Sequence, residues 1–180
     1  MNIFVGGSSR DTDNEYYNSI AEVIGDFIVN HQHNLIFGGC NSGLTGKVYS
    51  RLIGCDNSKI ITVIPKAYEE DLKEIKCDLA LLCDSIAERK NYFVDSSDVL
   101  LFLPGGIGTM DELFSAIESK RSHEHNLPII IVNANNYFKP FFNILNNIFE
   151  EGFADSKDQD LYFVANSLSE TINYLLKVEN

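Results

Sequence analysis

The sequence predicts an α/β protein with a Rossmann-like, doubly wound and mostly parallel sheet flanked by helices on both faces. Three observations support this prediction. Short apolar runs alternate with amphipathic segments along the whole chain, which is the pattern of repeated βαβ units. Two runs, VLLFL and IIIV, are continuously apolar, as strands buried on both faces are. Two Gly-rich turns follow apolar runs and lead directly into helical segments, as in nucleotide-binding folds.

The expected strands are the short apolar runs, taken in chain order. They are Asn2–Val5, Leu35–Phe37, Lys59–Ile64, Leu79–Leu82, Val99–Leu103, Ile129–Val132 and Tyr162–Val164. Between the first two, five apolar side chains fall at helical spacing and predict a helix that covers one face of the sheet: Tyr17, Ile20, Ile24, Phe27 and Ile28. Helix starts are indicated by capping-box pairs at Thr12/Glu15, Ser85/Glu88, Thr109/Glu112 and Ser167/Glu170.

Length and charge limit the classes of function. The chain has 180 residues, with 14 Lys and Arg against 26 Asp and Glu, a formal net charge of −12. This length is typical of one domain, so we expect residues 1–180 to form a single Rossmann-like nucleotide-binding domain. The acid excess argues against a nucleic-acid partner, because phosphate neutralisation needs a basic stripe. No signal peptide and no apolar run of about 20 residues is visible, so we expect a cytoplasmic protein with no membrane partner.

Two glycine-rich loops are the expected ligand site, because ligands of such folds bind beyond the carboxyl ends of the strands. The loop at residues 38–46 follows the second strand, and the loop at residues 104–109 follows the fifth. Glycine allows close approach of the backbone, and the start of the following helix favours an anion, so a phosphate is the expected guest. Asn41 and Val48 break the Walker pattern and Asp111 breaks the GxGxxG pattern, which argues against ATP hydrolysis and an NAD site.

Arg89 and Lys90 stand near the start of the helix that Ser85 is expected to cap. The helix dipole disfavours a cation there by roughly 0.3–1 kcal/mol. Such breaches of local preference concentrate at functional sites, so we expect Arg89 to face an anion. The alternative is that Arg89 or Lys90 pairs with a surface acid such as Asp84.

Glu112 has two interpretations. As the third residue after Thr109, it can complete a capping box, with a contribution on the order of 1 kcal/mol to the helix. It also stands one turn into the helix that follows the second glycine loop, beside any phosphate or sugar bound there. Glutamine caps about as well as glutamate but cannot accept a proton in catalysis, so Glu112→Gln separates the two roles.

The histidines form two His-x-His pairs, His31/His33 and His123/His125. Both pairs lie in polar segments at expected helix ends. Because no cluster of acids or cysteines in the sequence completes a ligand set, we interpret them as surface histidines and expect no metal site.

The motifs GGCNSGLTG, ERK and PGGIGTMDE, in this order, resemble those of the LOG family, the cytokinin riboside 5′-monophosphate phosphoribohydrolases. The resemblance runs from the apolar strand and Gly-Ser-Ser of residues 3–9 to the Glu-Glu-Gly-Phe of residues 150–153. PGGxGTxxE is its most specific part. The chain departs from the family in having Ile86-Ala87 before ERK, where Met-His is common, and Cys40-Asn41 in the first loop.

The resemblance implies hydrolysis of the N-glycosidic bond of AMP or an N6-substituted AMP to a free base and ribose 5-phosphate. It implies catalytic roles for Arg89 and Glu112, a homodimer or larger oligomer, and no metal or organic cofactor. The expected residues for binding substrate and phosphate are Gly38, Gly39, Gly43, Lys90, Gly105, Gly106, Gly108 and Thr109. A carboxylate suits this reaction, since it can stabilise an oxocarbenium-like transition state or activate water.

Two other functions were compared with this one. A pyridoxal phosphate decarboxylase needs a lysine with partners that hold the ring, and Lys90 has no such constellation in the sequence. A non-catalytic carrier of a nucleotide or phosphorylated cofactor is the stronger alternative, because similar folds can bind ligands without reaction.

Overall fold

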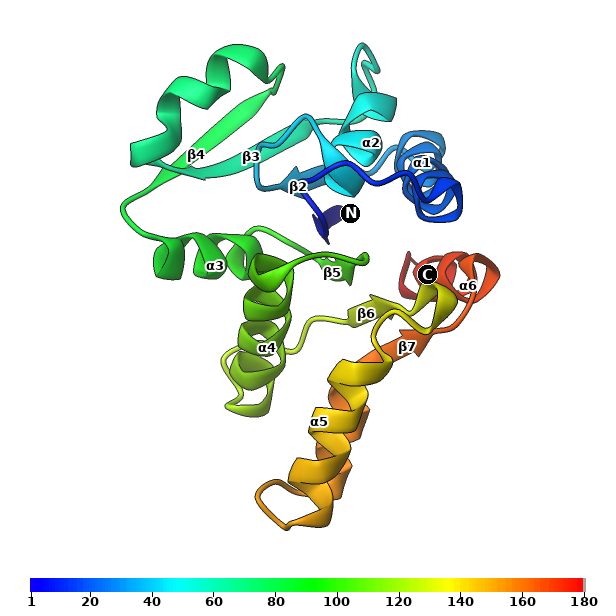
Figure 1. Cartoon of the computed structure of the whole chain (residues 1–180). Coiled ribbons are helices and arrows are strands. Elements are labelled where there is room, and N and C mark those ends of the chain that lie inside the picture. The colour runs from blue at the N-terminus through cyan, green and yellow to red at the C-terminus, as the bar shows by residue number, and fades with distance from the viewer. Residues whose placement is uncertain (180) are drawn as a thin grey trace.

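A single parallel sheet of seven strands forms the centre of the protein in a computed structural model that describes residues 1–179 (Figure 1). All seven expected strands are confirmed, with ends that differ from the expected ones by at most one residue. The strands are β1 Asn2–Gly6, β2 Asn34–Phe37, β3 Ile60–Pro65, β4 Leu79–Cys83, β5 Val99–Phe102, β6 Ile129–Val132 and β7 Phe163–Ala165.

The strand order is β4-β3-β2-β1-β5-β6-β7, and every pairing is parallel. The chain winds outward from β1 to β4, then returns to the other side of β1 with β5. The carboxyl ends of β1 and β5 therefore flank the point where the winding reverses. In open α/β sheets this is where a ligand crevice forms, because the loops leave the sheet in opposite directions.

Helices cover both faces of the sheet (Figure 1). They are α1 Glu15–Asn30, α2 Gly43–Leu52, α3 Ile86–Asp95, α4 Ile107–Arg121, α5 Lys139–Glu150 and α6 Leu168–Glu179, and short 3₁₀ segments span Lys66–Glu74, Ala134–Asn136 and Ser156–Leu161. Helices α1, α2 and α6 pack on one face, and α3, α4 and α5 on the other. Within residues 1–179, no helix is both long and apolar enough to cross a membrane.

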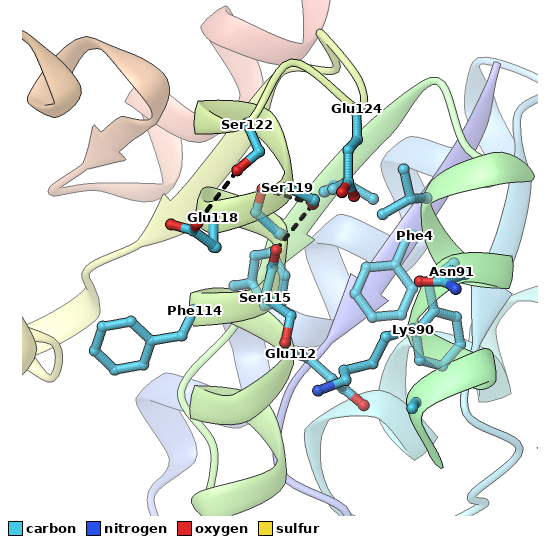
Figure 2. A pocket seen from close by; sticks show the side chains of 16 residues that line it. Phe4, Lys90, Asn91, Glu112, Phe114, Ser115, Glu118, Ser119, Ser122 and Glu124 are labelled. Atoms are coloured by element: carbon cyan, nitrogen blue, oxygen red, sulfur yellow. Dashed lines mark hydrogen bonds between the residues drawn. The ribbon is translucent and has the colours of Figure 1, made fainter. Parts of the chain in front are cut away.

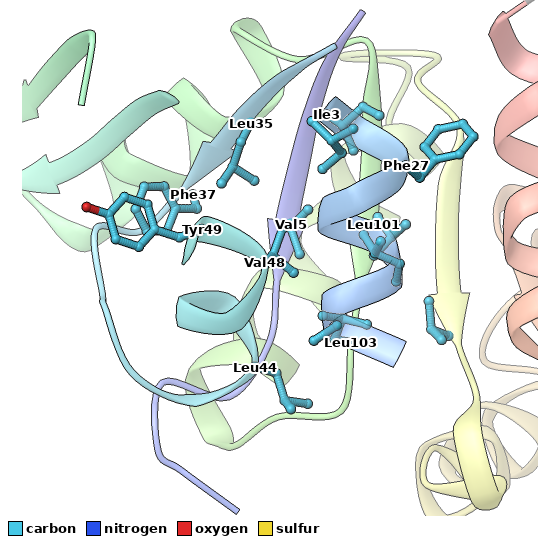
Figure 3. Packing of buried hydrophobic residues seen from close by; sticks show 14 of the residues in the cluster. Ile3, Val5, Phe27, Leu35, Phe37, Leu44, Val48, Tyr49, Leu101 and Leu103 are labelled. Carbon is cyan, nitrogen blue, oxygen red and sulfur yellow. The ribbon is translucent and has the colours of Figure 1, made fainter. Parts of the chain in front are cut away.

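Alternation along the strands divides the core into two layers. In β1, Ile3 and Val5 face the α1 and α2 layer, whereas Phe4 faces the α3 and α4 layer. Figure 3 shows the first layer, in which side chains of α1 and α2 pack against Val5, Leu35 and other residues of the central strands. β5 and β6 are buried along their whole length, as their continuous apolar runs predict.

The structure confirms two of the four expected helix starts. Ser85 and Ser167 each accept a hydrogen bond from the backbone N–H three residues later, of Glu88 and Glu170. Each of these glutamates reaches back one residue beyond the cap, to the N–H of Asp84 or Asn166.

The other two expected starts are wrong. Asn14 rather than Thr12 caps α1, because its carboxamide oxygen accepts from the N–H groups of Tyr16 and Tyr17. Helix α4 begins earlier than the Thr109/Glu112 pair predicts, with Gly106 as its N-cap. Glu112 is therefore well inside α4 and has no capping role.

Candidate active site

The loop after β1 meets the loop after β5 at the reversal point of the sheet. The backbone N–H of Ser8 donates to the carbonyl of Pro104 at 3.0 Å. A Cβ added at Gly105 would lie 2.1 Å from the Thr109 hydroxyl oxygen and 2.8 Å from the Ser8 nitrogen, so only glycine allows this approach. The loops enclose a pocket of about 500 Å³, which we call the polar pocket. Its lining is Phe4 to Arg10, Gly38, Cys40, Thr45, Arg89, Gly106 to Thr109 and Glu112.

The N-terminus of α4 opens into the polar pocket and offers free donors that suit an anion. Ile107, Gly108 and Thr109 are its first three residues, and none of their N–H groups has a hydrogen-bond partner among residues 1–179. Such N–H groups have no acceptor inside the helix, and they carry the positive end of its dipole. The first turn of α4 contains no acidic residue. An anion bound here would receive donors that the protein itself does not use.

The N-terminus of α2, in contrast, is already filled by the protein. The Gly43 N–H donates to the Asp11 carboxylate at 2.9 Å, and the Thr45 N–H donates to the Ser8 carbonyl at 3.3 Å. Gly43 has a φ of +67°, and a Cβ there would lie 2.2 Å from the Ser8 carbonyl oxygen. Asp11 therefore occupies the position expected for a phosphate. The two hydrogen bonds hold the loop after β1 against the start of α2. Gly43 is absent from the lining of the polar pocket.

Arg89 is held by the ends of two strands. Its Nε donates to the carbonyl of Val63 at 3.0 Å, and its Nη2 donates to the carbonyl of Gly38 at 2.8 Å. The guanidinium also lies 5.1 Å from the centre of the Phe93 ring, a favourable cation–π distance. A Cβ at Gly38 would lie 1.9 Å from Nη2. Gly38 thus makes room for the arginine, and both residues line the polar pocket.

Glu112 lies on α4, partly buried, at the junction of the polar pocket and a second pocket. Burial is the main cause that raises the pKa of its carboxyl group from an ordinary 4.5 to about 7. The charge of Asp111 also raises this pKa, whereas the charges of Arg89 and Lys90 lower it. Within residues 1–179 no group donates a hydrogen bond to this carboxylate. A carboxyl group with a pKa near the ambient pH can exchange a proton with a substrate or with water.

The second pocket, about 550 Å³, lies between α3 and α4 and has a mainly apolar lining, to which Phe4, Phe93 and Phe102 contribute. We call it the apolar pocket. Figure 2 looks into it: Glu112 and Lys90 lie at one end, and Ser122 and Glu124 at the other. The Lys90 ammonium is paired with the Asp111 carboxylate, at 2.9 and 3.0 Å from its oxygens.

The structure brings most of the expected site residues together. Gly38, Arg89, Gly106, Gly108, Thr109 and Glu112 line the polar pocket. Gly105 does not line this pocket, but it allows the close contact between the loops after β1 and β5. Gly39 adopts a φ of +73° in the loop after β2, and Lys90 lines the apolar pocket. The expected catalytic and binding roles of these residues stay predictions.

Sequence reasoning missed the contribution of the β1 loop. Ser8, Ser9 and Arg10 line the polar pocket, although the expected ligand site consisted of the loops after the second and fifth strands. The motif GGSSR after the first apolar run was the available signal. Its importance depends on β1 pairing with β5, a long-range contact that no local pattern reveals.

Residues 46–175 match the model of a protein family described as "Possible lysine decarboxylase". Two curated relatives are similar over most of the chain. A "Probable cytokinin riboside 5'-monophosphate phosphoribohydrolase LOG4" of Oryza sativa subsp. japonica is 27% identical over 174 residues, covering 96% of this chain and 74% of the relative. A "Cytokinin riboside 5'-monophosphate phosphoribohydrolase" of Mycobacterium tuberculosis is 29% identical over 155 residues, covering 85% and 82%.

Two solved structures have a similar fold. A molybdenum cofactor carrier protein of Chlamydomonas reinhardtii superposes with a TM-score of 0.68 and 21% identity, covering 98% of this chain and 96% of the other. A molybdenum cofactor binding protein of Rippkaea orientalis gives a TM-score of 0.68 and 18% identity, covering 99% and 96%. At these identities the likeness concerns the fold.

Proposed function

Because the chain belongs to the LOG family, whose model is described as "Possible lysine decarboxylase", we propose that it hydrolyses the N-glycosidic bond of a nucleoside 5′-monophosphate. The products are the free base and ribose 5-phosphate. One observation carries the proposal: the open N-terminus of α4 and the protonatable carboxyl of Glu112 line the same pocket.

The 5′-phosphate is assigned to the N–H groups of Ile107, Gly108 and Thr109, which have no other acceptor. Glu112 lies four residues beyond Gly108, which is about 6 Å along the helix axis. A nucleotide anchored by its phosphate at the helix end would therefore bring its sugar near the Glu112 carboxylate. Binding energy of the phosphate, which does not react, then orients the reacting carbon.

In the reaction a water oxygen bonds to C1′ and the C1′–N bond breaks, with its electron pair leaving on the base. The base takes up a proton, and the water loses one. The Glu112 carboxylate can accept the proton of the water or stabilise the positive charge that develops on the sugar. Arg89, bound to two backbone carbonyls, is fixed in position beside this carboxylate and favours its ionised form.

The apolar pocket suits the base. Glu112 lines both pockets, so a nucleotide whose sugar faces this residue has the polar pocket on its phosphate side and can place its base toward the apolar pocket. Phe4, Phe93 and Phe102 offer an apolar surface to an adenine or to a substituent on its N6. We therefore propose AMP or an N6-substituted AMP as the substrate.

The direct test is incubation of the purified protein with AMP and N6-isopentenyl-AMP, followed by chromatographic detection of the free base. Release of base by the wild type and by Glu22→Gln, but not by Glu112→Gln, is expected. Glu22 is an exposed residue of α1 that lines neither pocket, so its variant controls for the substitution itself.

Two outcomes would contradict the proposal. Thermal stabilisation by the nucleotide without any product would favour a non-catalytic carrier, the alternative that the sequence left open. Cleavage of CMP or GMP far faster than of any adenylate would show that the base assignment is wrong.

We further propose that the protein forms a homodimer or a larger oligomer through the surface around the two pockets. Ile107 lines the polar pocket and is 90% exposed, and Ile86 on α3 and Phe114 on α4 are also exposed. Apolar side chains grouped on a surface favour contact with another protein. Light scattering during size-exclusion chromatography should give a mass of at least two chains. A mass of one chain would contradict this proposal. The expected cytoplasmic location stays a prediction.

A further inference from the structure

We propose that His31, His33 and Glu179 form a binding site for a transition-metal dication of the zinc type, at the edge of the sheet opposite the candidate active site. His31 follows the end of α1, and His33 directly precedes β2. Glu179 is the last residue of α6. The site would connect the C-terminal ends of these two helices.

The three side chains converge on one point. The Nδ1 atom of His31 lies 3.0 Å from one carboxylate oxygen of Glu179, and the Nε2 atom of His33 lies 3.6 Å from the other. One potential ligand atom from each of the three residues lies within 4.8 Å of the others. A tetrahedral zinc ion with bonds of about 2.0–2.1 Å holds its ligand atoms roughly 3.3 Å apart, a spacing between the two observed distances.

An unpartnered buried atom points into this cluster. His33 is only 4% exposed, which corrects the expectation that it is a surface histidine. Its Nε2 atom is buried and has no hydrogen-bond partner, since 3.6 Å to Glu179 is too long for one. Buried polar atoms in native proteins nearly always have a partner. A metal ion between the three side chains would supply it.

The chemistry of the ligand set indicates the class of metal. Two imidazoles and one carboxylate suit zinc and neighbouring transition metals, whereas Mg²⁺ and Ca²⁺ prefer sites made of oxygen ligands. Three protein ligands leave a fourth position for water.

In the other His-x-His pair, both ring nitrogens of His125 have hydrogen-bond partners. The Nε2 atom of His125 lies 3.1 Å from both the Ala116 carbonyl and the Ser119 hydroxyl, and its Nδ1 accepts from the Leu127 N–H. Both ring nitrogens are therefore used. This pair provides a matched control, because it has the same sequence pattern and no carboxylate of residues 1–179 converges on it.

The test is calorimetric titration of the reduced protein with Zn²⁺ at pH 8, with no nucleotide present. We expect one zinc ion per chain with a dissociation constant below about 10 µM, and binding at least tenfold weaker in His31→Asn and in Glu179→Gln. Both substitutions are at partly exposed side chains, so folding should be retained. His123→Asn, in the control pair, should bind zinc as the wild type does.

Thermal unfolding gives a second measurement. Zinc should raise the unfolding temperature of the wild type and of His123→Asn by several degrees, and that of Glu179→Gln much less. Absence of zinc binding at about 100 µM would overturn the proposal. Equal binding by the wild type and both site variants would also overturn it, because the ion would then be held elsewhere, for example by thiols.

Discussion

Replacement of Glu112 by glutamine should make the protein more stable than the wild type at pH 8 while removing its activity. The physical reason is the pKa of Glu112, raised mainly by burial from 4.5 to about 7. Between these two values the native state keeps a proton that the unfolded chain has lost. The stability of the wild type therefore falls as the pH rises through this window, and Glu112→Gln is free of this loss.

The size of the effect follows from the two pKa values. At about 1.36 kcal/mol per pKa unit, the ionised Glu112 costs the native state about 3 kcal/mol above pH 7. At pH 5 the cost is about 1 kcal/mol, since the carboxyl remains protonated in the folded state. The stability of Glu112→Gln relative to the wild type should thus increase by about 2 kcal/mol between pH 5 and pH 8, or about 4–8 °C in Tm for a domain of this size.

The assay is urea or thermal unfolding of wild type and variant at both pH values. The stability difference between variant and wild type is measured at pH 5 and at pH 8. Any effect of the new amide that does not depend on pH cancels when one difference is subtracted from the other. Glu118→Gln is the control, because a hydrogen bond from Arg121 lowers the pKa of Glu118, and its replacement should bring no gain at pH 8. If the stability of the wild type and that of Glu112→Gln change equally between pH 5 and pH 8, the pKa of Glu112 is not raised and the argument for its protonation is wrong.

Three further predictions concern activity. Gly38→Ala should lower kcat/KM at least about a hundredfold, because the new Cβ would overlap the Arg89 guanidinium. The double variant Gly38→Ala/Arg89→Ala should have a kcat/KM little lower than that of either single variant. If the two losses in activation free energy add instead, the two residues act separately. If the ionised Glu112 is the active form, kcat/KM should rise tenfold per pH unit up to about pH 7 and then level off, and a flat profile from pH 5 to pH 8 would exclude this role. Adenosine, which lacks the phosphate, should show a kcat at least about a hundredfold below that of AMP as well as a higher KM; an unchanged kcat would mean that the N-terminus of α4 does not orient the sugar.

Local signals in the sequence were sufficient for the strands, and they indicated several residues that line the polar pocket. Apolar runs such as Ile129–Val132 predict buried strands because a strand covered on both faces has no polar side. The motif PGGIGTMDE predicts an anion site, because glycines before a helix leave its N–H groups accessible. Where a helix starts is less certain from local patterns: Thr109 and Glu112 have capping-box spacing, yet the chain turns into α4 three residues earlier.

Contacts between distant segments decided the rest. Asp11 lies 32 residues from Gly43 in the sequence, and its carboxylate nevertheless fills the start of α2. Among residues 1–179, only one of the two glycine loops therefore leads into a helix whose first N–H groups are free. Glu179 lies 148 residues from His31 and completes a cluster that the histidine spacing alone does not contain. A hydrogen bond or a ligand set depends on distance in space, and the sheet order that sets these distances arises from the packing of the whole chain. The sequence by itself therefore determined which segments are strands and which loops were expected to hold an anion. The tertiary structure decided which backbone donors remain free, and it buried Glu112 so that the pKa of its carboxyl group is raised.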